Sequence, residues 1–329
     1  MSTPAFELLV LTIERDVPKI EVALPYMRRF LASNRIRFVA PRACIAELDR
    51  RGLVGADTLA VDENDVAAGL TVGLVCDLLS ARGADPSRAG WYFKQLLIFA
   101  YGMRSDSGEH YLVWDADTIP LRTLPFFDDR GRTILDRKTE HYPDYFETLK
   151  ALVGIDRQVS YSFIAEHMMM ARDIVRAFVD EAMRGEPYSG AAFAQRVMDS
   201  ISDEALARGA GFSEYESYGN FATSRFPERI AVRDSPSTRE GMNFYAWPPS
   251  APQLFALGRR YAWASFERWT AKKARFRAQV RLAMTRSLGW LWTAAAATLH
   301  PAACVRFAGI GRRRRSSLAR ERPDRSTAS

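Results

Sequence analysis

Two aspartates one residue apart, Asp115 and Asp117, directly follow an apolar run in "HYLVWDADTIPL" (110–121). Aspartate is a poor strand former, and burying a carboxylate is costly unless it is paired or binds a metal. On an extended segment this spacing lets both carboxylates point to one side, where hard oxygen ligands suit Mg²⁺ or Mn²⁺ and, through the ion, a diphosphate. The alternative is a strand-end turn in which Asp115 caps backbone amides. We favour metal binding.

A second pair of acids lies in "FSEYESYGNF" (212–221), where Glu214 and Glu216 alternate with tyrosines. A carboxylate can accept the proton of an attacking hydroxyl in a group-transfer reaction. If the segment is extended, the alternation places both glutamates on one side. Either glutamate can serve as the base, and we prefer Glu214. The alternative is a solvated strand whose acids have no chemical role.

Two histidines lie among aromatic and acidic neighbours. His141 is in a loop with Tyr142 and Tyr145, and aromatic rings mixed with polar groups are suited to stacking on a sugar. His167 follows Glu166 and precedes three methionines, which we interpret as core filler. His167 can be a third metal ligand, a contact to an acceptor molecule, or a hydrogen-bonded core histidine. Glu166 is a candidate for binding an acceptor hydroxyl.

The segments around these residues alternate between strand-like and helix-like patterns. Short apolar runs predict strands over residues 6–13, 35–40, 58–61 and 111–114. Helix-length stretches lie between them, over residues 17–33, 43–51 and 91–104. This alternation predicts a largely parallel sheet with helices on both faces, and ligands bind beyond the carboxyl ends of such strands. The aspartates therefore face a ligand crevice, together with Thr12, Glu14 and Arg15 after the first strand.

Composition narrows the class of protein. The chain has 329 residues, 47% of them hydrophobic, which is enough for a large core. Its three cysteines, Cys44, Cys76 and Cys304, are far apart and form no CxxC pair, so neither a disulfide framework nor a structural zinc site is indicated. The N-terminus lacks the basic start and long apolar run of a secretory signal. We expect a cytoplasmic protein.

The D-x-D stretch "YLVWDADTIPL" resembles the D-x-D strand of GT-A-fold nucleotide-sugar glycosyltransferases. Further stretches resemble a poorly characterised bacterial group of this type: "GWYFKQLLIFAYG" (90–102), "EHYPDYFETLKALVGI" (140–155), "SFIAEHMMM" (162–170) and "FSEYESYGNF". The resemblance covers roughly residues 6–250. The chain departs from that group at Lys94-Gln95, where paired glutamines are usual.

The resemblance implies a GT-A-like catalytic domain over residues 1–258, a Rossmann-type mixed sheet flanked by helices. About 1–125 would bind the nucleotide and 126–258 the acceptor. The implied reaction is metal-dependent transfer of a sugar from a nucleotide-diphosphate sugar to a glycan or lipid-linked acceptor, as in the synthesis of a bacterial surface polysaccharide. Mn²⁺ or Mg²⁺ would bind Asp115 and Asp117, and Asp117 would join the two glutamates as a catalytic residue.

The donor would contact residues of the first half of the chain. In the stretch 91–104 an apolar stripe faces the core and leaves Lys94 and Gln95 to one side, so Lys94 can pair with a phosphate and Gln95 with a ribose. The alternative for Lys94 is a solvated helix charge. The complete donor set is Thr12, Glu14, Arg15, Lys94, Gln95, Trp114 and Asp115. The acceptor set is His141, Tyr142, Tyr145, Glu166 and His167.

Other functions fit the D-x-D motif less well. In a haloacid-dehalogenase-like phosphatase this motif opens the domain, whereas here three predicted strands precede it, and the later acidic motif of that class is absent. A sugar nucleotidyltransferase needs a glycine-rich phosphate loop after its first strand, but "TIERDVPK" has no glycine. A non-catalytic scaffold that binds glycan or lipid is a third possibility.

The C-terminal region 259–329 differs from the body in charge. It holds 17 Lys and Arg against three Asp and Glu, a net charge of +14 in a chain of +7, so the preceding residues are acidic at −7. A basic helical pattern (270–286) leads into 19 residues without charge (287–305) and an arginine cluster (312–315). We interpret 270–315 as lying on an anionic membrane, peripheral to the inner face of the cell membrane. The alternative is a helical appendage with a disordered Arg-rich end. Because the body is acidic, no nucleic acid is expected as a partner.

Overall fold

The structure is a computed structural model in which residues 4–267 are described. The predictions for the segments 270–286, 287–305 and 312–315 lie outside the described residues. None of the helices between residues 4 and 267 has the length and apolarity that a membrane span requires.

Strands and helices alternate along the chain, as the sequence patterns predict. The strands are β1 (Glu7–Leu11), β2 (Arg35–Ala40), β3 (Thr58–Asp62), β4 (His110–Trp114), β5 (Thr118–Pro120), β6 (Thr133–Asp136), β7 (His167–Ala171), β8 (Ile230–Arg233), β9 (Ser237–Thr238) and β10 (Trp263–Ser265). The α-helices are α1 (Val17–Phe30), α2 (Arg42–Arg50), α3 (Val72–Ala81), α4 (Ala89–Met103), α5 (Pro143–Val153), α6 (Arg172–Met183), α7 (Gly190–Asp199), α8 (Asp203–Ala207), α9 (Glu214–Arg225), α10 (Gly241–Phe244) and α11 (Ala251–Gly258). Short 3-10 helices are η1 (Glu14–Asp16), η2 (Glu63–Asp65), η3 (Pro86–Arg88) and η4 (Pro227–Arg229).

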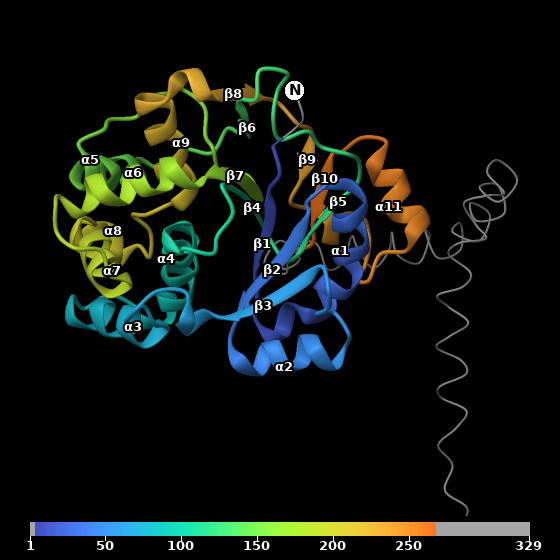
Figure 1. Ribbon diagram of the computed structural model, residues 1–329, viewed down its shortest axis with the longest axis horizontal. Coiled ribbons are helices and arrows are strands. Elements are labelled where there is room, and N and C mark those ends of the chain that lie inside the picture. The colour runs from blue at the N-terminus through green and yellow to red at the C-terminus, as the bar shows by residue number, and fades with distance from the viewer. Residues whose placement is uncertain (1–3, 268–329) are drawn as a thin grey trace, which may run out of the picture. The chain divides into compact units, whose positions relative to one another are not determined.

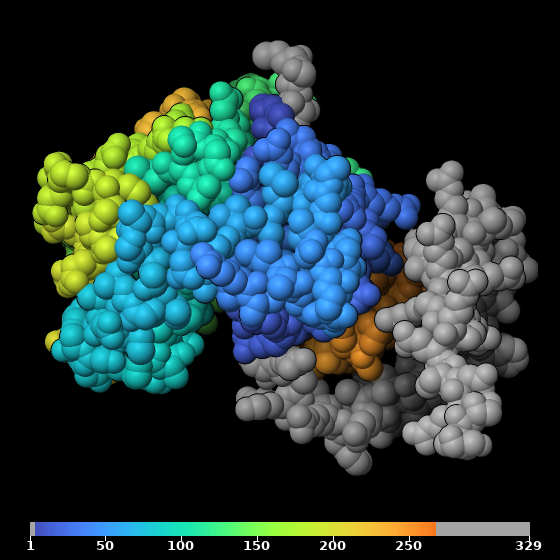
Figure 2. All heavy atoms as spheres, turned by 60° about the horizontal axis from the view of Figure 1, so that its bottom comes forward, coloured from blue at the N-terminus to red at the C-terminus, as the bar shows by residue number. Residues whose placement is uncertain are grey.

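The central sheet of the described part has the strand order β3-β2-β1-β4-β7 (Figure 1). The first four strands are parallel, and β7 runs antiparallel to β4. Figure 1 shows α1 and α2 on one side of this sheet and α4 and α6 on the other. Figure 2 turns the molecule so that α2 and β3 come to the front. The predicted α/β class, a mixed sheet flanked by helices, is confirmed.

Alternating residues of the strands supply two cores. On β1, Leu9 belongs to the cluster that includes α4, α6 and α9, while its neighbours Leu8 and Val10 are buried outside that cluster. Helix α4 is buried along most of its length, because apolar residues occur on nearly every side of it. Lys94 is partly exposed, between the buried residues Phe93 and Gln95. The helix therefore holds a charged side chain at a fixed point beside the sheet.

The described residues also form two smaller sheets. One has the order β5-β10-β9 and the other pairs β6 with β8. Strand β10 is antiparallel to β5, and the Phe266 N–H donates to the Asp117 carbonyl over 2.9 Å. Residues 259–267, which the sequence analysis groups with the tail, thus pair with the strand that follows the aspartates. The folded body extends past residue 258.

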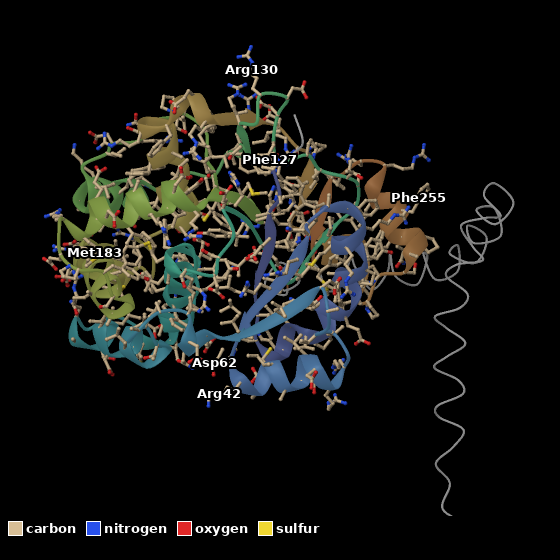
Figure 3. All side chains as sticks on the ribbon, viewed as in Figure 1. Arg42, Asp62, Phe127, Arg130, Met183 and Phe255 are labelled. Atoms are coloured by element: carbon tan, nitrogen blue, oxygen red, sulfur yellow. The ribbon has the colours of Figure 1, made fainter. Side chains whose placement is uncertain are left out.

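Residues 242–256 form part of a second compact unit. Within it, the Ser250 N–H donates to Gln253 Oε1 over 2.8 Å at the start of α11, and the Leu254 N–H donates to the Ser250 carbonyl over 3.0 Å. Phe255, labelled in Figure 3, is 68% exposed.

Candidate active site

The two aspartates occupy a tight turn at the carboxyl end of β4. The Asp115 N–H donates to the Glu166 carbonyl over 3.0 Å, and the Thr118 N–H donates to the Asp115 carbonyl over 3.0 Å. Backbone groups thus close this turn, and both carboxylates are left for other partners. This is the position at which ligands collect in sheets of this kind.

A lysine from a different helix neutralises each carboxylate. Lys94 Nζ of α4 lies 2.5 Å from Asp115 Oδ1, and Lys19 Nζ of α1 lies 3.1 Å from Asp117 Oδ2. Lys19 also lies 3.1 Å from Asp16 Oδ1. Burial opposes charge on Lys94, but the attraction of Asp115 and Glu214 outweighs burial and raises its pKa. Burial, followed by repulsion from Asp115, raises the pKa of Asp117, and Lys19 offsets part of that effect.

Glu214 belongs to the same charged cluster. It is the first residue of α9, is 7% exposed, and its N–H donates to Gln95 Oε1 over 3.1 Å. Burial raises the pKa of Glu214 to about 7; Lys94 counteracts this effect and Asp115 adds to it. A carboxyl with a pKa near neutrality can accept a proton at physiological pH. The structure therefore brings Glu214, Lys94, Gln95 and the aspartates together.

Glu216 does not share a side with Glu214. The segment is the first turn of helix α9 rather than an extended strand, and two residues on a helix point about 200° apart. Ser213 caps this helix, its Oγ accepting from the Glu216 N–H over 3.3 Å. The S-x-x-E spacing of a capping box, present at Ser213 and Glu216, is the signal that favours a helix here. The segment is not extended, so the condition under which both acids would lie on one side is not met.

The Glu216 carboxylate instead supports the core. It accepts from Ser162 Oγ over 2.6 Å and from Asn220 Nδ2 over 3.1 Å, and the residue is 1% exposed. In a Glu216→Ala variant the Ser162 hydroxyl loses its acceptor. We expect the free energy of unfolding to fall by about 1–3 kcal/mol, the cost of a buried unsatisfied polar group. Urea unfolding measures it, and an unchanged midpoint would contradict the structural role.

Trp114 and His167 are core residues. The antiparallel register pairs them across β4 and β7, and their rings stack with centroids 4.8 Å apart. The Trp114 indole N–H donates to the Thr118 carbonyl over 2.8 Å, and His167 Nε2 lies 3.0 Å from Asp136 Oδ2. Both side chains are buried. These surroundings favour the hydrogen-bonded core interpretation of His167, and the donor contact of Trp114 stays a prediction.

Glu166 lines a cavity of about 570 Å³. The same register that buries His167 sets Glu166 opposite Asp115. The Glu166 carboxylate accepts from the Trp263 indole N–H over 2.5 Å and lies 3.4 Å from Arg239 Nε. Other polar residues also line the cavity: Lys138, Glu140, Asp234, Ser237 and Arg239.

Arg239 links the cavity to Glu267, which is within electrostatic range of the aspartates. Its guanidinium lies 2.6 Å from Glu140 Oε1 and 2.9 Å from Glu267 Oε1. Burial raises the pKa of Glu267, Arg239 counteracts this effect, and the charges of Asp117 and Asp115 add to it. Burial also raises the pKa of Tyr215, and the negative charges of Asp115, Glu214 and Glu166 raise it further. The aspartates, Glu214 and the cavity are therefore within electrostatic range of one another.

The residues after β1 have different surroundings. Thr12 is buried, and the backbone N–H of Thr12 donates to the Val39 carbonyl over 3.0 Å. Glu14 and Arg15 are exposed in η1, whose last residue, Asp16, shares Lys19 with Asp117. At the neighbouring end of β3, Arg42 donates to the Asp62 carboxylate, and both residues are labelled in Figure 3.

The aromatic loop before α5 is only partly involved. The His141 ring stacks on Phe146 with centroids 5.6 Å apart, and Tyr142 is exposed. Burial raises the pKa of Tyr145, with further contributions from Tyr142 and then Glu214. Tyr145, which lies in the first turn of α5 and not in the loop, is thus within range of the charged cluster.

Four residues near the aspartates and the cavity were not predicted from the sequence: Lys19, Tyr215, Arg239 and Glu267. Each comes from a segment distant from the D-x-D motif in the chain, and nothing local distinguishes it from other charged or aromatic residues. Tyr215 alone lies inside a motif that the resemblance singled out.

The carboxylates of the D-x-D motif suit a divalent cation that is also coordinated by phosphate. Asp115 and Asp117 supply hard carboxylate oxygens, but within residues 4–267 no group of three or more His, Cys, Asp and Glu side chains could hold a metal ion. Mg²⁺ is typically bound by one or two carboxylates together with substrate phosphates. The two aspartates match such a half-site.

Comparison with known proteins finds distant structural similarity. No protein-family model matches the sequence, and no curated protein is significantly similar to it. Among solved structures, mouse xyloside xylosyltransferase 1 in its apo form is similar with a TM-score of 0.41 and 12% identity, over 81% of this chain and 99% of that chain. The galactosyltransferase LgtC with donor and acceptor sugar analogues has a TM-score of 0.36 and 13% identity, over 84% and 96%. An active-site mutant of LgtC has a TM-score of 0.36 and 14% identity, over 79% and 87%.

All three structures are glycosyltransferases, the class whose GT-A fold the sequence motifs resemble. Their TM-scores lie below 0.5. The inference about function therefore depends on the residues of the site.

Proposed function

We propose that this protein is a glycosyltransferase that transfers a sugar from a nucleotide-diphosphate sugar. The observation that carries the proposal is the convergence of Asp115, Asp117, Lys94 and Glu214 at the carboxyl end of β4. Cleavage of a sugar–diphosphate bond needs cations at the leaving diphosphate and a base for the attacking hydroxyl. In this cluster the two aspartates can bind a cation at the diphosphate. Glu214, whose pKa is near neutrality, can act as the base.

Each group has a role in this proposal. Asp115 and Asp117 hold Mn²⁺ or Mg²⁺, which when bound would neutralise charge on the leaving diphosphate. Lys94 pairs with a phosphate oxygen, and Gln95 orients the first turn of α9 through the Glu214 N–H. Glu214 takes the proton of the acceptor hydroxyl. A carboxyl in this position serves an inverting transfer, in which one base activates the incoming nucleophile.

The acceptor would enter the cavity lined by Glu166, Lys138 and Arg239. The charged side chains of the cavity form pairs of opposite sign. Arg137 pairs with Asp234, and Arg239 pairs with Glu140 and Glu166. A wall of paired ions and hydroxyls suits a ligand rich in hydroxyl groups. We propose a glycan or lipid-linked acceptor, with Glu166 binding one of its hydroxyls. Attachment of residues 270–315 to an anionic membrane would bring the site to a lipid-linked acceptor.

A screen of nucleotide sugars tests the proposal. Purified protein is incubated with each donor and Mn²⁺, and release of the nucleoside diphosphate is measured with and without EDTA. We expect release with one class of donor, and its loss in EDTA. Absence of release with every donor, together with hydrolysis of p-nitrophenyl phosphate, would favour the phosphatase alternative. Binding of glycan without either reaction would favour the scaffold.

A further inference from the structure

The aspartate pair carries its own counter-ions. Two carboxylates, Asp115 and Asp117, face two ammonium groups at 2.5 and 3.1 Å, so the four charges cancel. The two lysines come from α4 and α1, which approach the D-x-D turn from different elements. Asp–Lys pairs of this kind are not required to hold the turn, because backbone hydrogen bonds close it.

This arrangement opposes the binding of a cation alone. A divalent ion between the aspartates would lie within a few ångströms of two ammonium groups and would compete with them for the same oxygens. Repulsion between like charges at such distances is strong in a partly buried site. A diphosphate adds negative charge and further oxygen ligands, so it changes the balance in favour of the ion.

The two lysines differ in their other contacts. Lys19 is 9% exposed and has a second carboxylate, Asp16 Oδ1, at 3.1 Å, so it keeps a partner when Asp117 turns to a metal. Lys94 is 37% exposed, and its other anionic neighbours within electrostatic range are Glu214 and Asp117. Released from Asp115, Lys94 is free to reach a phosphate at the open side of the site.

We propose that Lys94 and Lys19 keep the aspartate pair from capturing a divalent cation until the diphosphate of the donor is present. On donor binding, Lys94 exchanges Asp115 for a phosphate oxygen, Lys19 retains Asp16, and the freed carboxylates take the cation. The metal ion and the diphosphate therefore bind as a unit. This inference rests on the proposed function, because it assumes that the ligand carries a diphosphate.

Binding of Mn²⁺ to the full chain without nucleotide provides the test, measured through the electron paramagnetic resonance signal of free Mn²⁺. We expect weak binding to the unaltered protein and an affinity at least about tenfold higher for Lys94→Gln, which removes one competing charge. Lys94→Arg keeps the charge and should bind as weakly as the unaltered protein. Lys150→Gln removes an exposed lysine that pairs with Asp156 at 2.8 Å, and it should change nothing. Thermal unfolding of each variant verifies that it is folded.

Further outcomes separate this inference from the proposed function. In the presence of UDP, GDP, ADP or CDP, the unaltered protein should bind Mn²⁺ at least about tenfold more tightly with one of them, and Lys94→Gln should lose most of that gain. If the unaltered protein binds Mn²⁺ alone as tightly as Lys94→Gln does, the counter-ion role is wrong, while nucleotide-dependent binding would leave the proposed function intact. If no diphosphate binds with Mn²⁺ to any variant, both proposals fail.

Discussion

Replacing Asp115 or Asp117 with asparagine is expected to lower sugar transfer by about 10²–10³-fold, the usual cost of removing one group that stabilises developing charge. Asparagine keeps the shape of the side chain but removes the charge that holds a cation on the diphosphate. The fold should survive, because backbone hydrogen bonds close the turn. Since the Asp115–Lys94 pair is partly exposed, its loss should change the free energy of unfolding by no more than about 1 kcal/mol.

A matched control exists on the surface. Asp156 also pairs with a lysine, Lys150, at 2.8 Å, but both side chains are mostly exposed and lie outside the proposed site. Asp156→Asn should therefore keep full activity and nearly full stability. The measurement is release of the nucleoside diphosphate, with urea unfolding in parallel. Full activity in folded Asp115→Asn, or undiminished activity of the unaltered protein in EDTA, would be incompatible with metal-assisted transfer.

The sequence predicted those parts of the fold that depend on local patterns. Apolar runs at 6–13, 35–40, 58–61 and 111–114 correspond to β1 to β4, and the apolar stripe of 91–104 corresponds to α4. Once parallel strands are expected, the strand-end rule puts Asp115 and Asp117 at the ligand edge without further information. Helix boundaries differ by a few residues, as fraying of helix ends makes usual.

The rest depends on tertiary pairing that no local pattern encodes. The antiparallel register of β7 on β4 decides that His167 is buried against Trp114 while Glu166, one residue earlier, reaches the cavity. A sequence pattern shows that the two residues alternate but not which one faces the core. Lys19 is likewise an ordinary helix lysine until α1 packs beside the D-x-D turn. The predicted acceptor role of Glu166 stays a prediction, supported by its position.

Replacing Glu214 with glutamine is expected to have two opposite effects. Transfer should fall by about 10²–10⁴-fold, because the amide cannot accept the proton of the acceptor hydroxyl. Stability at pH 8 should rise, because burial of the ionised carboxylate in the unaltered protein is unfavourable. The displacement of the Glu214 pKa from 4.5 to about 7 corresponds to up to about 3 kcal/mol. Asp156→Asn is the control, since it removes an exposed carboxylate outside the proposed site and should leave both quantities nearly unchanged.

The pH dependence determines whether this interpretation is correct. A carboxyl whose pKa is higher in the folded than in the unfolded protein contributes its stability below pH 4.5, and that contribution is lost as the pH rises to about 7. The stability difference between Glu214→Gln and the unaltered protein should therefore grow between pH 4.5 and 7 and stay constant above.

Transfer by the unaltered protein should rise over the upper part of this range, since only the ionised carboxylate is a base. Urea unfolding without metal or donor, and initial rates across the same pH values, provide both curves. An inactive variant that gains no stability would show that the pKa of Glu214 is not raised in the folded protein. A variant that gains stability but keeps its activity would show that another group takes the proton.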